Sequence, residues 1–296
     1  MPAFSIILPT NKRPSDFKQS VISCLSSSFK DFELLIGIQD IKKWNEGDGN
    51  DKDFTRDARV RLIDASMASN LSANLNILLK NLGSPFAVRH DDDDYMHPLR
   101  MIRLHDNLEV VKRSVFIGQS YKTFGISHSR VISPKIDPLV RDCENREKLL
   151  VGPCFAHPAI TLNMDRLLYC YDEEFDYAQD YKLYVDNFNA GRFAGLPSMA
   201  TYYNLPDPRK SSYAKKRIRQ LAYHDICMAK LWGHLIGSSS DVNRATLGFR
   251  KLFLTSEDSD LAKSASGFSK DDMGKFLKVY HQVLARMKEV CASKVE

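Results

Sequence analysis

The chain has 296 residues, 43% hydrophobic and 27% charged, which is ordinary for a soluble globular protein. Its formal net charge of +5 is too small to indicate nucleic-acid binding unless the excess is clustered. The six cysteines form no C-x-x-C pair, which argues against a zinc site or a small disulfide framework, and no apolar run reaches the roughly 18–20 residues of a membrane span.

The first forty residues predict a strand, a helix and a second strand. The run FSIILP, residues 4–9, is almost continuously apolar, as in a strand buried on both faces of a parallel sheet, and Pro9 is expected to end it. Residues 15–29 place apolar side chains close to helical spacing. FELLIGI, residues 32–38, is a second apolar run. This βαβ unit predicts a parallel sheet with a right-handed crossover.

The next segment continues the same alternation. Residues 41–58 are polar and predict a loop, and VRLID, residues 60–64, predicts a third strand. NLSANLNILLKNLG, residues 70–83, places its leucines on one face of a helix, with Gly83 expected to end it. PFAVRH, residues 85–90, predicts a fourth strand.

Acidic side chains follow two of these strands. Asp40 comes after the second strand, and four consecutive aspartates, Asp91–Asp94, come after the fourth. Ligands of open α/β sheets bind outside the carboxyl ends of the strands, so these carboxylates are expected at one rim. Carboxylate oxygens suit hard cations such as Mg²⁺ and Mn²⁺, which commonly share their ligands with phosphates. The alternative is a solvated acidic turn without a ligand.

The second half of the chain has weaker patterns. They predict, in order, a strand and turn at 115–125, an irregular insertion at 126–150, a strand leading into a short helix at 155–175, a helix at 178–191 closed by Gly191, and a strand at 192–204. Beyond Pro208 the sequence turns into long, basic helical patterns. We therefore expect an α/β domain over residues 1–208 and a helical extension over 209–296.

Five blocks of the sequence, taken together, resemble the GT-A fold of family 2 glycosyltransferases. They are LPTNKRP, FELLIGIQD, LSANLNILL, DDDDYMHPLRM and HPAITLNMDRLLYCYDEEFDYAQDYKLYVDNFNAGRFAGLP. The likeness covers residues 3–205, and the blocks occur in the family's order and spacing. It implies a Rossmann-like, mostly parallel central sheet flanked by helices. A nucleotide-sugar half would occupy about residues 1–115 and an acceptor half about residues 116–208.

The resemblance also implies a nucleotide site in the first half. Residues after the first strand would line it, namely Pro9, Thr10, Asn11 and Arg13. Asp40 would accept a hydrogen bond from the base, for which uracil is favoured. Asn76 would lie near the nucleotide on its helix.

Asp91 and Asp93 would form the D-x-D pair of this family. Asp93 would bind Mn²⁺ or Mg²⁺ directly, and Asp91 would lie closer to the ribose and the metal. Because the four aspartates are consecutive, the register is open by one residue. Asp92, which is also expected beside the nucleotide, and Asp94 remain candidates.

Asp180 falls where the family carries the general base that deprotonates the acceptor hydroxyl. Inverting transfer requires this carboxylate on the face of the sugar opposite the nucleotide. Gln179 stands where the family usually has a glutamate, and it is expected on the acceptor side. The alternative is that Asp180 only caps or solvates a helix. His157 could orient the acceptor, or it could simply pack against the sheet.

The sequence departs from the family after the last strand, where many relatives carry a histidine that reaches the diphosphate or the metal. The corresponding run, YYNLPDPRKSS, has none. Arg209 or Lys210 could hold the diphosphate instead, or Asp207 could contact the metal.

The first tail helix, around residues 213–237, combines basic residues with an apolar face. Such a helix could lie on an anionic membrane surface and serve a lipid-linked acceptor, but packing on the catalytic domain or on a second subunit is favoured. The N-terminus has no charged leader and the cysteines are scattered, so we expect a cytoplasmic protein that could lie peripherally on the inner face of the membrane.

These observations predict an inverting, metal-dependent glycosyltransferase. It would transfer a sugar, from a UDP-sugar by preference, to a hydroxyl of a saccharide acceptor in bacterial surface polysaccharide or lipopolysaccharide synthesis, with no nucleic-acid partner. One alternative is a catalytically degenerate protein that serves for binding or as a scaffold. A nucleotidyltransferase is disfavoured because LPTNKRPSD lacks the glycines of a phosphate loop.

Overall fold

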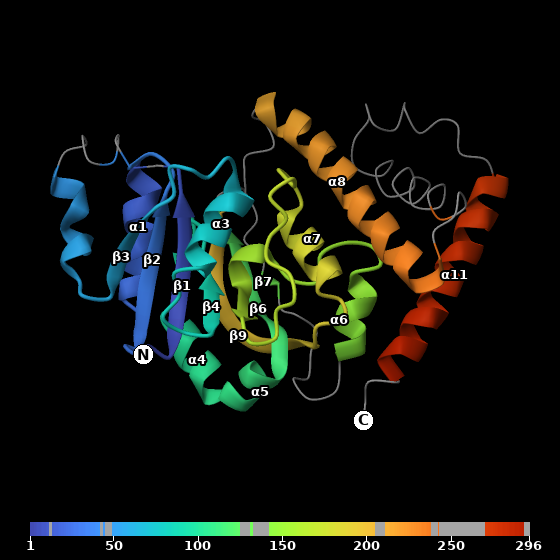
Figure 1. Ribbon diagram of the computed structural model, residues 1–296, viewed down its shortest axis with the longest axis horizontal. Helices are drawn as coiled ribbons and strands as arrows, with labels where there is room; N and C mark the ends of the chain where they lie inside the picture. The colour runs from blue at the N-terminus through green and yellow to red at the C-terminus, as the bar shows by residue number, and fades with distance from the viewer. Residues whose placement is uncertain are drawn as a thin grey trace.

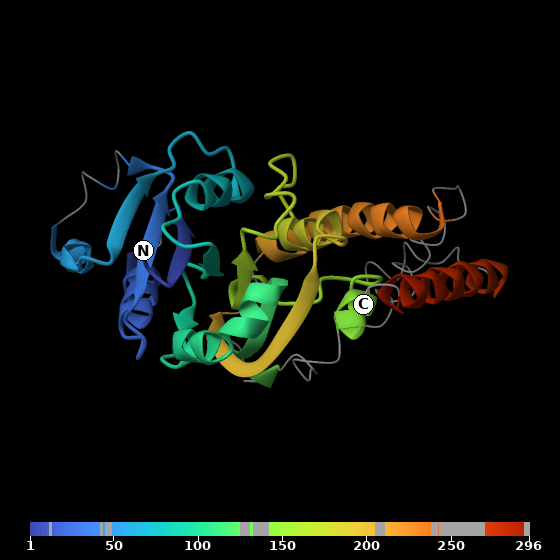
Figure 2. The ribbon, with the colours of Figure 1, turned by 60° about the horizontal axis from the view of Figure 1, so that its bottom comes forward.

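The computed structural model describes residues 1–11, 14–41, 44, 49–124, 131–132, 142–204, 211–237, 242 and 270–292. A mixed nine-stranded sheet runs through its centre in the order β3-β2-β1-β4-β8-β6-β9-β5, and β7 pairs with β6 beside this path (Figure 1). Helices lie on both faces of the sheet (Figure 2).

The first half of the chain forms the parallel part of the sheet. β1 (Phe4–Thr10) lies between β2 (Phe32–Ile38) and β4 (Phe86–Arg89), and β3 (Val60–Asp64) pairs with the outer edge of β2. All four strands run in the same direction, as the apolar runs predicted, and every residue of β1, β2 and β4 is buried. Their carboxyl ends therefore meet at one rim.

Alternating side chains of β1 enter two separate hydrophobic clusters. Ile6 and Leu8 face the cluster formed with α1 (Pro14–Leu25), α4 (Arg100–Asp106) and α5 (Leu108–Arg113). Ile7 faces the cluster formed with α3 (Leu71–Leu79) and α7 (Gln179–Asp186). The period of two along a strand thus supplies a core to each face of the sheet.

The second half of the chain extends the sheet with mixed pairings. β8 (Ile160–Asn163) is antiparallel to both β4 and β6 (Ser114–Phe124), whereas β9 (Arg192–Asn204) runs parallel to β6 with three register shifts. The short strand β5 (Tyr95–Met96) pairs with β9 at one edge, and β7 (Val131–Ile132) pairs with residues 121–122 of β6. β9 is long and curved (Figure 2), and its last residues return to the rim where β4 ends.

Several elements differ from the sequence expectation. The predicted loop at 41–58 contains a 3-10 helix, η1 (Gly49–Arg56), and the predicted insertion at 126–150 contains α6 (Asp142–Lys148). β8 is not followed by the expected short helix: turns follow it at residues 164–166 and 173–174, and side-chain bonds from α3 and Asn187 hold residues 168–175 in place.

Two helices end before the glycines that were expected to close them. α3 ends at Leu79, with Lys80 as its C-cap, and Gly83 lies beyond it. α7 ends at Asp186, with Asn187 as its C-cap. The side chain of Asn187 bonds to the backbone of Leu168 and Tyr169, which fixes this end of the helix without a glycine. Gly191, with φ of 154°, lies further on at the start of β9.

The C-terminal extension contains two long helices, α8 (Ser211–Ile236) and α11 (Lys270–Ala292). The apolar face of α8 is buried in the same cluster as α7, and the indole of Trp232 donates a hydrogen bond to the carbonyl of Leu150 at 2.9 Å. This agrees with packing of α8 on the α/β part of the chain, the alternative that was favoured for this helix. In the described part of the chain, no helix combines the length and apolar character needed to cross a membrane. The boundary expected at residue 208 falls outside the described residues.

Candidate functional site

The ends of β1 and β4 are joined by a side-chain contact at the rim. The hydroxyl of Thr10 donates to a carboxylate oxygen of Asp92 at 2.7 Å, across 82 residues of sequence. Asp40 lies at the exit of the adjacent strand β2 and is half-buried, and its carbonyl accepts from the backbone of Trp44 at 3.0 Å. The structure therefore brings the three predicted acidic and hydroxyl groups to one edge of the sheet.

Asp91 is held by a buried arginine that sequence reasoning missed. The guanidinium of Arg89, fully buried at the end of β4, forms an ion pair with the carboxylate of Asp91 and also donates to the carbonyl of His90. The hydroxyl of Ser20 donates to the carbonyl of Asp91 at 2.9 Å. An arginine inside an apolar strand was the available signal, because a buried charge needs a partner.

Asp94 is a structural member of the acidic run. Its carboxyl is fully buried, and one oxygen accepts from the backbone N–H of Asn204 at 2.8 Å, which ties the end of β9 to the rim. The other oxygen has no hydrogen-bond partner among the described residues. Burial, and then the charge of Asp91, raise the pKa of Asp94 well above its ordinary value.

The acidic side chains left facing solvent can hold a small, hard cation. Asp91, Asp92 and Asp93 are half-buried, whereas Asp94 is enclosed. Within the described residues, no group of three or more His, Cys, Asp or Glu side chains converges as a complete metal site. Mg²⁺ and Mn²⁺ sites built with substrate phosphates need only one or two protein carboxylates. The donor set at this rim therefore fits a cation that is shared with a diphosphate.

Asp180 lies in the first turn of α7, after an unusual backbone turn. Ala178, the residue before the helix, has φ of 52°, a left-handed conformation that is uncommon outside glycine, asparagine and aspartate. Burial raises the pKa of the Asp180 carboxyl to about 6, while hydrogen bonds from backbone N–H groups at residues 180 and 181 oppose this shift and the charge of Asp91 adds to it. A carboxylate with a pKa near 6 is suited to act as a base at neutral pH.

A pocket of about 390 Å³ lies directly beside Asp180. Its polar and reactive lining includes Gln119, Lys148, Cys154, His157, Asp180 and Tyr203. Burial, and next the charge of Arg89, lower the pKa of His157 well below its ordinary value, so its imidazole is neutral at pH 7. Its Nε2 lies 2.8 Å from the hydroxyl of Tyr171, which fixes the ring within the pocket.

Helix α3 holds the segment that leads to Asp180. The side chains of Asn70 and Ser72 donate to backbone carbonyls of that segment, at Glu173 (2.7 Å) and Phe175 (3.2 Å). The amide of Asn76 donates to the carbonyl of Tyr171 at 2.8 Å and accepts from its N–H at 3.0 Å. Asn76 was expected beside the nucleotide, but its amide is engaged in positioning this segment.

The remaining predicted residues are placed as follows. Pro9 is buried in β1 opposite Gly37, and Asn11 is exposed just beyond the strand. The amide of Gln179 donates to the carbonyl of Asp176 at 2.7 Å, so it caps the turn before α7. Other named residues, Arg13, Asp207, Arg209 and Lys210, lie outside the described part of the chain.

Solved glycosyltransferases share this fold. No protein-family model matches the chain, and no curated protein does either. The structure of residues 1–349 of TarS from S. aureus superposes with a TM-score of 0.53 at 15% identity, covering 97% of this chain and 91% of that 1–349 chain. The same region of TarS in complex with UDP-GlcNAc gives a TM-score of 0.51 at 13% identity, covering 97% and 92%.

A mannosyltransferase gives a similar result. PcManGT from Pyrobaculum calidifontis, solved with GDP-Man and Mn²⁺, superposes with a TM-score of 0.53 at 12% identity, covering 99% of this chain and 88% of that protein. The chain therefore has the GT-A fold of nucleotide-sugar glycosyltransferases over nearly its whole length, as the sequence resemblance implied. At these identities the likeness concerns the fold.

Proposed function

We propose that the chain is an inverting glycosyltransferase that moves a sugar from a nucleotide-diphosphate sugar to a hydroxyl of a saccharide acceptor in the cytoplasm. The observation that carries the proposal is the separation of two acidic sites. Asp91–Asp93 lie at the rim of the parallel strands, while Asp180 lines its own pocket with a pKa near 6. Inverting transfer needs a donor site and a base on the opposite side of the reacting carbon.

Asp180 acts as the base in this mechanism. Its carboxylate takes the proton of the acceptor hydroxyl while the acceptor oxygen forms a bond to the anomeric carbon of the donor. The bond from that carbon to the diphosphate breaks in the same step, and the nucleoside diphosphate leaves with the electron pair. His157 and Tyr203, which line the same pocket, hold the acceptor in position for this displacement.

Asp91 and Asp93 would hold Mn²⁺ or Mg²⁺, which neutralises charge on the departing diphosphate when bound. Asp40, Thr10 and Asp92 would contact the nucleoside. We favour UDP-sugars as donors. TarS was solved with UDP-GlcNAc, which supports this choice. PcManGT was solved with GDP-Man and Mn²⁺, which supports a GDP-sugar instead.

The proposed acceptor is a saccharide from which a bacterial surface polysaccharide or lipopolysaccharide is built. The half-buried Lys148, at the end of α6, lines the base pocket and forms no ion pair within the described residues. Its ammonium would contact the acceptor and favour acceptors that carry a negative group.

Thermal unfolding with UDP, GDP, CDP and dTDP, each with and without Mn²⁺, tests the donor site. A ligand that binds only the folded protein raises its stability by about 2.7 kcal/mol at a hundredfold excess over Kd. We expect one diphosphate to stabilise the protein only with metal, and Asp93→Ala to abolish this. No stabilisation by any of the four would refute the donor site, and donor binding without hydrolysis or transfer of any nucleotide sugar would favour a degenerate binding protein.

A further inference from the structure

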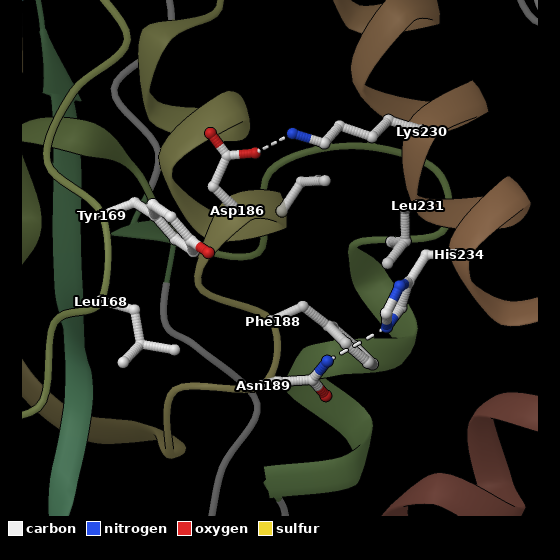
Figure 3. Close-up of a pocket in the computed structure, with 9 residues that line it drawn as sticks. Leu168, Tyr169, Asp186, Phe188, Asn189, Lys230, Leu231 and His234 are labelled. Carbon is white, nitrogen blue, oxygen red and sulfur yellow. Dashed lines mark hydrogen bonds and ion pairs between the residues drawn. The ribbon is translucent and has the colours of Figure 1, made fainter.

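A second cavity, of about 410 Å³, lies between α7, α8 and the segment that follows β8 (Figure 3). Among the described residues, it shares no lining side chain with the pocket of Asp180. Asp186, on its wall, is six residues from Asp180, which places the two about 9 Å apart along the helix and about 120° apart around it. The two cavities therefore open on different faces of α7. The volume is within the range of about 300–1,000 Å³ usual for ligand sites.

The cavity has an apolar floor and an exposed apolar rim. Val185, Phe188 and Leu231 are buried beneath it, whereas Leu168 and Tyr169 at its edge are 61% and 59% exposed. Figure 3 shows both rim side chains on the side of the cavity opposite α8. Large apolar side chains that gather, exposed, at the edge of a hollow mark a binding surface.

The polar wall of the cavity is balanced in charge. The carboxylate of Asp186 pairs with Lys230 at 2.6 Å and with Lys182, which in turn pairs with Asp172 at 2.9 Å. Lys230 and Asp186 line the cavity, so one ammonium group there is matched by one carboxylate, and the pair of Lys182 and Asp172 continues the balanced network outside the lining. An ionic ligand would meet a like charge beside any opposite charge it contacted, so this wall favours a neutral ligand.

The hydrogen-bonding groups on the wall include donors and acceptors side by side. The ammonium of Lys230 and the carboxylate of Asp186 form one pair, and the amide of Asn189 and the ring of His234 form another, with 3.0 Å between Nδ2 and Nε2 (Figure 3). Sugar hydroxyls donate and accept at adjacent positions, and the C–H faces of a sugar ring are apolar. An aromatic ring such as Tyr169 offers a flat apolar face for that surface.

We propose that this cavity is a second saccharide-binding site, which holds a neutral sugar residue of a polymeric acceptor away from the residue that reacts at Asp180. The assignment of the occupant as acceptor rests on the proposed function. The site itself is a prediction about binding, because it requires neither donor nor metal.

Direct binding of oligosaccharides tests the site. Saturation-transfer NMR and isothermal titration would measure binding of maltoheptaose, chitohexaose and α-mannohexaose, with heparin fragments of similar length as charged counterparts. The wild type is compared with three variants. Tyr169→Ala alters the cavity, and Ile226→Ala is the control that removes an exposed apolar side chain on α8. Asp180→Asn alters the other pocket. Tyr169→Ala should fold, because only backbone atoms of Tyr169 bond to Asn187.

We expect at least one neutral oligosaccharide to bind the wild type. Its Kd should rise about tenfold in Tyr169→Ala, which is a loss of about 1.4 kcal/mol of binding free energy. The Kd should be unchanged in Ile226→Ala and in Asp180→Asn. Absence of binding by all three sugars, binding of heparin fragments that Tyr169→Ala weakens to the same extent, or a loss in Asp180→Asn but not in Tyr169→Ala would each overturn the proposal. Donor hydrolysis should be unchanged in Tyr169→Ala. If the wild type hydrolysed no donor, the proposed function would be refuted, but the measured binding of oligosaccharides would still stand.

Discussion

Replacing Asp180 by asparagine should remove the base and, at neutral pH, stabilise the fold. Loss of a general base lowers the rate of transfer by about 10²–10⁴. The side chain keeps its shape, so donor binding at the rim should persist. The gain in stability follows from the environment of the carboxyl, which burial makes unfavourable when it is ionised.

The size of this gain follows from the pKa of Asp180. Raising that pKa from 3.8 to about 6 lowers the free energy of unfolding by about 3 kcal/mol once the group is ionised in both states. Because the side chain is partly accessible, we expect about 1–2 kcal/mol. The folded protein binds the proton more tightly than the unfolded chain, so this loss of stability is absent below pH 3.8, develops as the pH rises to 6 and is complete above pH 6. Asparagine does not titrate.

Urea unfolding of the wild type and Asp180→Asn at pH 4, 5, 6 and 7.5 measures this difference. The two proteins should have similar stability at pH 4, the variant should become more stable between pH 4 and pH 6, and the difference should then stay constant. Asp165→Asn, an exposed aspartate, serves as the control. A pH-independent difference, or a variant less stable at pH 7.5, would refute the burial argument.

Three further substitutions test other parts of the site. In Gly118→Ala, the new Cβ would lie 2.1 Å from Cδ1 of Phe155, so we expect a loss of about 1–3 kcal/mol in urea unfolding and a disturbed pocket. Lys148→Gln should raise the KM for an anionic acceptor several-fold and leave donor hydrolysis unchanged in steady-state assays. Asn76→Ala leaves the buried backbone of Tyr171 without partners, so we expect about 1–3 kcal/mol of lost stability and slower transfer at unchanged donor KM.

Each of these has a matched control in the same chain. Gly152→Ala should be neutral, since no atom lies within 4 Å of the new Cβ, and an equal loss there would exclude the contact with Phe155 as the cause. Lys112→Gln removes an exposed lysine, and the same change in KM would indicate a general charge effect. Asn81→Ala breaks only a local bond to Ile77, so a loss equal to that of Asn76→Ala would contradict the positioning role.

The sequence predicted the parts of the fold that depend on local pattern. Continuous apolar runs located β1, β2 and β4, and the rule that ligands bind at the carboxyl ends of strands placed Asp40 and Asp91–Asp94 at one rim. Thr10 was expected there through the family resemblance, and the structure bonds it to Asp92.

The parts that the sequence did not predict depend on contacts between distant segments. Tyr203 reaches the pocket of Asp180 because β9 runs parallel to β6 with three register shifts. The residue pattern of one strand does not predict its pairing partner or its register. Lys148 reaches it through α6, which lies in a stretch of weak pattern. Asn76 lies on a helix that was predicted, but its partner, Tyr171, is 95 residues away.

The hydrophobic cluster that supports α7 is completed by side chains from near the end of the described chain. Trp232 on α8 and Val283 and Met287 on α11 belong to it, whereas β1 to β4 come from the first 90 residues. Ribosomes add about 5–20 residues per second, so roughly 10–40 seconds separate the emergence of the two groups. The parallel strands can therefore pair while the apolar side of α7 is still exposed, and this interval is when the nascent chain is most open to aggregation and most dependent on chaperones.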